Sequence, residues 1–359
     1  MASVKRRPDG QWRARYRDDA GKEHARHFPR KVDGQKWLDE QTAALVGGTH
    51  VAPRDARITF AQWADTWLAG YGTNRESTVR QAKVHLAKIK AEFGPLLISA
   101  VRPSHVKSWT ARLKADGAAD SYVYALHSRL SQVMSDAVHD GVLARNPCSR
   151  RTSPGAGRQR PYVATTAQVW ALYDAMPQRL RAAVLLGAFV GLRAAEACGL
   201  RVEHVDFMRA VVHPTVQYPA DELKTTTSRT PIPVPADLAL TLSAHVRSWP
   251  GEWVLTNELG RQLGPWQLDR AVRDARGKVA GLPAGFRFHD LRHYLASLLI
   301  ASGADVKVVQ TRLRHASATT TLNTYAHLWP DADESTRAAV GAVLAARADS
   351  LRTQTGTSR

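Results

Sequence analysis

The stretch of residues 288–328 constrains the fold most, because it places polar, chemically active side chains at the ends of short helices. His289 and Arg292 are three residues apart and therefore share one face of a helix. His315 follows a second short helix, and Tyr325 closes a third. An Arg fork, imidazoles and a phenol suit an anionic oxygen centre, because guanidinium binds phosphate bidentately and stays charged. We therefore predict phosphoryl chemistry here, with a covalent phosphotyrosine as one outcome.

Glycine and capping residues predict where these helices begin and end. Gly303 is predicted to stop the first helix, and Ala304 or Asp305 to start the next. Ser317 is predicted to cap the helix that ends at Tyr325. The polar cluster is thus expected to be assembled from several helix ends.

The net charge indicates which class of substrate such a cluster would bind. The chain has 359 residues, 50 Lys and Arg against 32 Asp and Glu, a formal net charge of +18 and a pI near 10.3. This length predicts two or three domains. The positive excess favours nucleic acid or an acidic surface as partner, although an ordinary solvated basic surface has the same composition.

Cysteine usage and hydropathy limit the cellular setting. Cys148 and Cys198 are too few for a disulfide framework or a Cys-rich metal site, so we expect a reducing cytoplasm. No apolar core follows the basic N-terminal residues, which argues against a signal peptide. No run approaches about 18 apolar residues, so no membrane span is expected.

Residues 12–17 alternate between apolar and basic side chains, which is the period of a half-buried strand. Turn residues flank this strand, and residues 4–7 and 24–28 are predicted to pair with it. A helix over residues 32–46 would cover the sheet. A β-ribbon with a basic face can enter a DNA groove, although a solvated strand face is the alternative. The basic face consists of Arg13, Arg15 and Arg17.

Residues 58–147 are predicted to form a helical bundle, because four segments carry apolar residues at helical spacing. Their expected first residues are Thr59, Ser77, Ser104 and Ser121. Residues 148–164 then change to Pro, Gly and Arg without an acidic residue. Arg150 and Arg151 in this basic linker suit a phosphate backbone, and a plain interdomain linker is the compatible alternative.

From residue 165 onward the sequence predicts a mainly helical domain with a small antiparallel sheet. Thr165 or Thr166 should cap its first helix, and residues 180–190 form an apolar, buried one. Arg193 follows this apolar helix and needs a partner, for which Glu196 and a bound phosphate are the candidates. Three short strands are expected, at residues 205–207, 211–217 and 230–234, and a polar turn between the last two presents Lys224.

Five motifs then fall into one order along the chain. They are Gly-Leu-Arg193-x-x-Glu196, Lys224-Thr-x-x-Ser-Arg, His289-x-Leu-Arg292-His293, Leu-x-His315-x-Ser317 and Tyr325-x-His327. In this order they closely resemble the tyrosine recombinases of the phage-integrase type. The resemblance covers roughly residues 1–330. It departs at Arg314, where the family usually has Gly and where an arginine could tighten or crowd the phosphate pocket, and at Ala195, where Gly is frequent.

The resemblance implies a mainly α fold with small β-sheets (α+β) and a division into five segments. These are an arm-type DNA-binding domain over 1–52 (three-stranded sheet plus helix), a helical core-type DNA-binding domain over 58–147, the basic linker over 148–164, a catalytic domain over 165–330, and a tail over 331–359. The tail would pack either on its own domain or on a neighbouring subunit.

The resemblance also assigns chemical roles to matching residues. Tyr325 would attack the scissile DNA phosphate and form a 3′-phosphotyrosyl link. Arg193 and Arg292 would hold the non-bridging oxygens, where charge accumulates in the transition state. Lys224 would protonate the departing 5′-oxygen, His289 would accept or share the tyrosine proton, and His315 would hydrogen-bond the phosphate. Glu196 would orient Arg193.

The function implied by the resemblance is site-specific recombination that integrates or excises a phage or mobile element, without metal or cofactor. The expected partners are core-type and arm-type DNA attachment sites, bound by a homotetramer in the cytoplasm of a bacterial host, at the nucleoid. Whether an excision factor or a DNA-bending protein assists stays open.

Three alternatives compete with this interpretation. The first is a catalytically silent, site-specific DNA-binding protein on the same scaffold, which is disfavoured because all six candidate groups are present. The second is a zinc site at His289 and His293, which is disfavoured because the usual Glu is absent and a cationic Arg lies between them. The third is a single-subunit topoisomerase, which shares the chemistry but not the predicted N-terminal layout.

Overall fold

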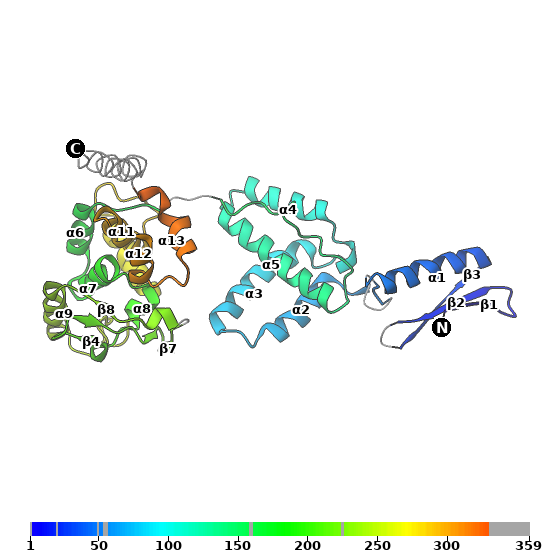
Figure 1. The fold of residues 1–359 in the computed structure, drawn as a ribbon, viewed down its shortest axis with the longest axis horizontal. Coiled ribbons are helices and arrows are strands. Elements are labelled where there is room, and N and C mark those ends of the chain that lie inside the picture. Colours follow the sequence, from blue (N-terminus) through cyan, green and yellow to red (C-terminus); the bar gives the residue numbers. More distant parts are fainter. Residues whose placement is uncertain are drawn as a thin grey trace, which may run out of the picture. The chain divides into compact units, whose positions relative to one another are not determined.

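The computed structural model describes residues 2–18, 21–48, 50–52, 57–157, 161–223 and 226–329, the side chain of residue 226 excepted. The chain divides into two compact units, residues 1–158 and 159–359, which are described separately. Both are mainly helical with small antiparallel sheets, as predicted (Figure 1). Within the described residues, we find no helix with the length and apolar character that a membrane crossing requires.

The first unit begins with the predicted sheet and helix. Its antiparallel strands are β1 (Ser3–Arg6), β2 (Trp12–Arg17) and β3 (Glu23–Phe28), in the order β1-β2-β3, followed by α1 (Lys31–Val46). Ala14 and Tyr16 on β2 are buried, which confirms the alternation read from the sequence. The basic face is less open than expected, because Arg13 and Arg15 both pair with Glu23, at 3.0 and 3.3 Å.

Four helices form the rest of the described part of this unit: α2 (Phe60–Tyr71), α3 (Glu76–Phe93), α4 (Pro103–Ala115) and α5 (Asp120–His139), with a 3-10 turn η2 (Ile98–Ala100). Their apolar stripes pack into one core, which includes Trp63 and Trp109. Thr59 caps α2 through a capping box with Gln62, as its hydroxyl position predicts. The other three helices begin one residue before the serines expected to open them, and α4 starts with Pro103, whose missing N–H is tolerated there.

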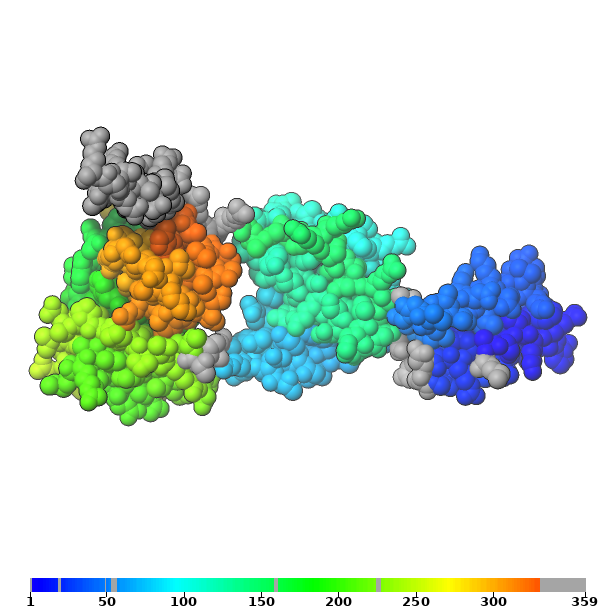
Figure 2. Space-filling view, in the orientation of Figure 1, coloured from blue at the N-terminus to red at the C-terminus, as the bar shows by residue number. Residues whose placement is uncertain are grey.

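The second unit surrounds an apolar core with helices. These are α6 (Thr166–Ala175), α7 (Arg181–Leu185), α8 (Ala194–Cys198), α9 (Ala236–Ser248), α10 (Pro265–Arg276), α11 (Phe288–Ala301), α12 (Val306–Arg312) and α13 (Ala318–Tyr325). Short 3-10 turns are η3 (Gln178–Leu180), η5 (Val202–His204), η6 (Thr226–Arg229) and η7 (Ala326–Leu328), and η4 (Leu186–Val190) is a π-helical turn. The segment with α12 and α13, orange in Figure 2, lies at the surface.

The small sheets of this unit differ from the prediction. One sheet has the order β4-β5-β8 (Val205–Asp206, Val211–Val212, Ile232–Pro233), and a separate hairpin joins β6 (Val216–Gln217) to β7 (Asp221–Glu222). The single strand predicted over residues 211–217 is therefore wrong. Pro214 lies in its middle, and a proline has no N–H to donate to a neighbouring strand.

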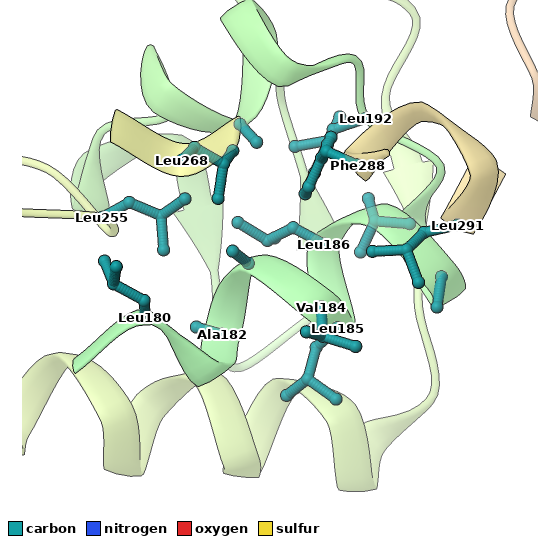
Figure 3. Close-up of a cluster of buried hydrophobic side chains, with 14 of the residues drawn as sticks. Leu180, Ala182, Val184, Leu185, Leu186, Leu192, Leu255, Leu268, Phe288 and Leu291 are labelled. Carbon is teal, nitrogen blue, oxygen red and sulfur yellow. The ribbon is translucent and has the colours of Figure 1, made fainter. Parts of the chain in front are cut away.

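The turn η4 packs against α11 at very short range, which fixes the helix that carries His289 and Arg292. Figure 3 shows Leu186, Phe288 and Leu291 gathered in the apolar core. Gly187 lies between them: a Cβ at this position would be 2.9 Å from Leu291 Cβ and 3.1 Å from the Phe288 ring. The absence of a side chain at Gly187 is what lets the two helices approach.

We expect Gly187→Ala to lower the free energy of unfolding by about 1–3 kcal/mol, since an added methyl in a close-packed core forces its neighbours apart. Urea unfolding followed by circular dichroism measures this change. The matched control is Gly285→Ala, where an added Cβ meets nothing within 4 Å, and which should unfold at nearly the wild-type urea concentration. Equal stability of both variants would contradict the packing argument.

Candidate active site

A left-handed glycine positions the first basic residue of the site. Gly191, at φ 74°, ends η4 and turns the chain, so that Arg193 becomes the residue immediately before α8. Glu196, three residues on, accepts a hydrogen bond from the Arg193 backbone N–H at 3.0 Å. The same carboxylate accepts one from the Arg193 guanidinium at 2.8 Å. The local partner predicted for Arg193 is thus confirmed.

Arg292 lies on α11 and is 1% exposed. Its guanidinium donates hydrogen bonds to the Gly191 and Leu313 carbonyls, which tie η4 and the end of α12 to this one side chain. Burial first, and then the charges of Arg193 and Arg314, lower the pKa of Arg292 to about 9, so that it stays cationic at neutral pH. A guanidinium has five N–H donors, so Arg292 can hold the site together and still offer donors to an anion.

Arg314, which the sequence analysis noted only as a departure from the family pattern, is a member of this cluster. Its side chain is fully buried, and its guanidinium reaches Glu196 at 2.5 Å and the Ser228 carbonyl at 2.7 Å. Burial alone would raise the pKa of Glu196, but Arg314 and Arg193 together lower it below the ordinary value. One carboxylate therefore bridges two arginines.

The backbone at Arg314 is left-handed, at φ 53°. This conformation costs a residue with a side chain about 1–2 kcal/mol. It follows directly on the end of α12, where a glycine would be the ordinary choice. The sequence suggested that Arg314 could tighten or crowd the phosphate pocket, and in the structure its guanidinium donates to Glu196 and to the Ser228 carbonyl.

Tyr325 ends α13 with its side chain buried. Its hydroxyl is 2.6 Å from His293 Nδ1. Burial raises the pKa of Tyr325 to about 12, although Arg292 acts in the opposite direction. His293 thus occupies the place beside the phenol that the sequence suggested for His289. The His289 ring is 5.0 Å from the His293 ring, centroid to centroid.

Two histidines beside the phenol, His293 and His315, and the neighbouring His289 are held neutral. Burial, followed by nearby cationic groups, lowers the pKa of His293 and of His315 to about 4. His289 is exposed, yet the protein packed around it, with His293 and Arg292, lowers its pKa to about 4 as well. His315 Nδ1 lies 2.9 Å from Thr321 Oγ1, and its ring is parallel to that of Tyr325. A neutral imidazole can accept a proton or donate a hydrogen bond at neutral pH.

These lowered pKa values make a prediction about acid stability. The unfolded chain takes up a proton on His293 near pH 6.5, whereas the fold resists it down to about pH 4, so stability is present above pH 6.5 and is lost as the pH falls. Between pH 7 and pH 5, protonation of His293 in the unfolded chain should lower the free energy of unfolding of wild type by up to about 2 kcal/mol, and His293→Gln should lack this decrease. Urea titrations at both pH values measure it, and an identical loss in wild type and variant would contradict it.

The remaining predicted residues lie either outside the described residues or in the other unit. Lys224 lies outside the described residues, as does the tail over 331–359. Arg13, Arg15, Arg17, Arg150 and Arg151 belong to the other unit. Among the described residues, no group of three or more His, Cys, Asp or Glu side chains comes together as a metal site would require.

Comparison with known proteins shows what this chain is similar to. The model of the phage integrase family matches residues 163–331. The chain is 28% identical over 334 residues to a putative prophage phiRv2 integrase of Mycobacterium tuberculosis (strain ATCC 25618 / H37Rv), covering 86% of this chain and 87% of the relative. It is 29% identical over 254 residues to the tyrosine recombinase XerC of Mycobacterium sp. (strain KMS), covering 66% of this chain and 80% of the relative.

Two known structures share the fold. The integrase of transposon Tn1549, in complex with transposon right end DNA, matches with a TM-score of 0.69 at 20% identity, over 80% of this chain and 100% of that one. A lambda integrase dimer bound to a core site matches with a TM-score of 0.63 at 17% identity, over 91% of this chain and 96% of that one. Residues 163–331 thus match the phage integrase family model, and the chain is similar in sequence to a prophage integrase and to a tyrosine recombinase XerC and similar in fold to two integrases.

Proposed function

We propose that this protein is a site-specific DNA recombinase that cuts and rejoins DNA through a 3′-phosphotyrosyl intermediate, and thereby integrates or excises a phage or mobile element in the cytoplasm of a bacterial host. The observation that carries the proposal is the hydrogen bond between the Tyr325 hydroxyl and a neutral His293, beside the buried cation Arg292. A phenol, a proton acceptor and a guanidinium are what phosphoryl transfer to tyrosine needs.

The proposed cleavage step transfers two protons, one from Tyr325 to His293 and one from Lys224 to the departing 5′-oxygen. Tyr325 Oη attacks the phosphorus of the scissile phosphodiester and gives its proton to His293 Nδ1. The bond from phosphorus to the 5′-oxygen breaks, and Lys224 supplies the proton that makes this oxygen a hydroxyl. Rejoining is the reverse reaction with the 5′-hydroxyl of another strand, so the phosphate bond energy is conserved and no ATP is required.

The cationic residues would stabilise the phosphate during this step. Arg292 and Arg193 would hold the non-bridging oxygens, and His315 and the exposed His289 would hydrogen-bond them. Glu196 would orient Arg193 through the two hydrogen bonds described above. The raised pKa and burial of Tyr325 mean that α13 must shift when DNA arrives, because an inaccessible hydroxyl cannot reach a phosphorus atom.

We further propose that residues 1–52 bind arm-type sites and residues 58–147 bind core-type sites, joined by the basic linker 148–164 to the catalytic domain 165–330. The lambda integrase, similar in fold with a TM-score of 0.60, has been solved as a tetramer bound to a Holliday junction. A homotetramer on paired DNA sites is the corresponding assembly here, with the tail 331–359 as a candidate contact between subunits. An excision factor and a DNA-bending protein are candidate accessory partners.

The test is covalent capture of DNA. The protein is incubated with a pool of nicked duplexes of randomised sequence, in which cleavage releases a short fragment and prevents rejoining. We expect a protein–DNA adduct that survives denaturant, whose peptide map places the nucleotide on Tyr325. The burial of Tyr325 favours one competing function, a silent site-specific DNA-binding protein. Sequence-selective binding without any adduct would establish that alternative.

A further inference from the structure

The cluster of Arg193, Glu196, Arg292 and Arg314 contains one arginine that the proposed chemistry does not use. Arg314 has a fully buried side chain, and its guanidinium bonds only inward, to the Glu196 carboxylate and the Ser228 carbonyl. Its Nε is buried and has no hydrogen-bond partner among the described residues. Arg314 thus contacts Glu196, which in turn holds Arg193.

The position of Arg314 is unfavourable in two ways. Its backbone is in the left-handed region, and its charge is withdrawn from water near two other guanidiniums. Backbone strain and buried charge of this kind persist where the surrounding structure holds the residue in place, and they are concentrated at functional sites. Arg314 is held by Glu196, whose carboxylate also accepts hydrogen bonds from the guanidinium and the backbone N–H of Arg193.

The charges of the cluster show what Arg314 changes. With three guanidiniums and one carboxylate, it carries two net positive charges, which matches the roughly two negative charges that a phosphodiester acquires as an anionic oxygen adds to it. Without Arg314, Glu196 would cancel the charge of Arg193, and one net positive charge would remain.

We infer that Arg314 is a positioning residue for strand cleavage. Its positive charge balances the negative charge of Glu196 and holds this carboxylate in place, so that Glu196 orients Arg193 without neutralising the charge of Arg193. The inference rests on the proposed function. It assigns to Glu196 a second partner 118 residues away, and it makes the charge of the cluster depend on a residue to which the proposed chemistry gives no contact with the phosphate.

The test compares Arg314→Gly, Glu196→Gln and the double variant. Glycine fits the left-handed backbone, so Arg314→Gly removes the guanidinium without adding strain. Single-turnover adduct formation on a captured nicked duplex should be at least about tenfold slower in Arg314→Gly, with DNA affinity within about twofold of wild type, because a remote positioning residue acts on the transition state more than on binding.

Adding Glu196→Gln to Arg314→Gly should recover part of the rate, since it removes the carboxylate that now cancels Arg193. A role in folding alone predicts the opposite, namely a double variant at least as slow as either single one. Arg314→Lys keeps the charge and should stay faster than Arg314→Met, and this pair replaces Arg314→Gly if circular dichroism shows that the glycine variant does not fold. A wild-type rate in Arg314→Gly, or equal rates of Arg314→Lys and Arg314→Met, would overturn the inference.

A second measurement does not depend on catalysis. In Arg314→Gly the folded-state pKa of Glu196 should rise, because the carboxylate has lost a counter-charge, so the part of the unfolding free energy that is lost through Glu196 as the pH falls should be smaller than in wild type. Urea titrations at several pH values measure this pH dependence, and in a Glu196→Gln background the removal of Arg314 should no longer change it. An unchanged pH dependence overturns the inference. Absence of any adduct in wild type, with the change in pH dependence present, overturns the proposed function and leaves the charge pairing standing.

Discussion

Tyr325→Phe should form no detectable adduct with DNA. The substitution removes one oxygen atom and keeps the buried ring, so the fold loses only the hydrogen bond to His293, worth about 1 kcal/mol. The reaction loses its nucleophile, and removal of a covalent nucleophile costs on the order of a million-fold in rate. Denaturing gels of the nicked-duplex reaction measure the adduct, and a mobility-shift assay should show DNA binding within about twofold of wild type.

Tyr294→Phe is the matched control for this experiment. Tyr294 is also buried and also makes one hydroxyl contact, with Thr166 at 3.1 Å, but it lies outside the cluster of Arg193, Glu196, Arg292 and Arg314. It should form adduct at close to the wild-type rate. Adduct formation by Tyr325→Phe, or an equal loss in both variants, would refute the assignment of Tyr325 as nucleophile.

Arg292→Met should separate activity from stability. Loss of the guanidinium leaves the Gly191 and Leu313 carbonyls without this donor, at about 1–3 kcal/mol each. The fold also disfavours the charge itself: a pKa lowered from 12.5 to about 9 corresponds to about 5 kcal/mol. The two effects oppose each other, so the free energy of unfolding should change by less than about 2 kcal/mol.

The rate of adduct formation should nevertheless fall by at least about a thousand-fold in Arg292→Met, because charge on the phosphate is no longer stabilised in the transition state. Urea titration and the single-turnover assay give the two numbers for one protein. Arg276→Met is the control: Arg276 also donates to a backbone carbonyl, that of Phe286 at 2.8 Å, and should keep its rate. A thousand-fold loss in Arg276→Met as well would show that the effect is structural.

Interactions between near neighbours in the chain were predictable. The pairing of Arg193 with Glu196 follows from a spacing of three residues, and the caps at Thr59, Thr165, Asp305 and Ser317 follow from side chains that reach the next turn. The order of the motifs, which sequence alone gives, indicated the resemblance to phage integrases and, through it, the mainly helical fold.

Interactions between distant segments were not predictable. Arg314 and Glu196 are 118 residues apart, and nothing local in either motif specifies their contact. His293 and Tyr325 are 32 residues apart, so only the packing of α11 against the segment after α12 decides which of two histidines, His289 or His293, meets the phenol. A single strand was predicted over residues 211–217, but Pro214 lies in its middle, and the structure has the two separate strands β5 and β6 there.

The burial of Tyr325 has a consequence for a protein that is surrounded by chromosomal DNA. With a pKa of about 12, roughly one phenol in a hundred thousand is ionised at pH 7, and its ring is covered by protein. If Tyr325 is the nucleophile we propose, a free copy of the protein is harmless to the phosphodiesters it meets by chance. Chromosome breakage is then withheld until a cognate sequence rearranges α13, which makes recognition of the target itself the trigger of the reaction.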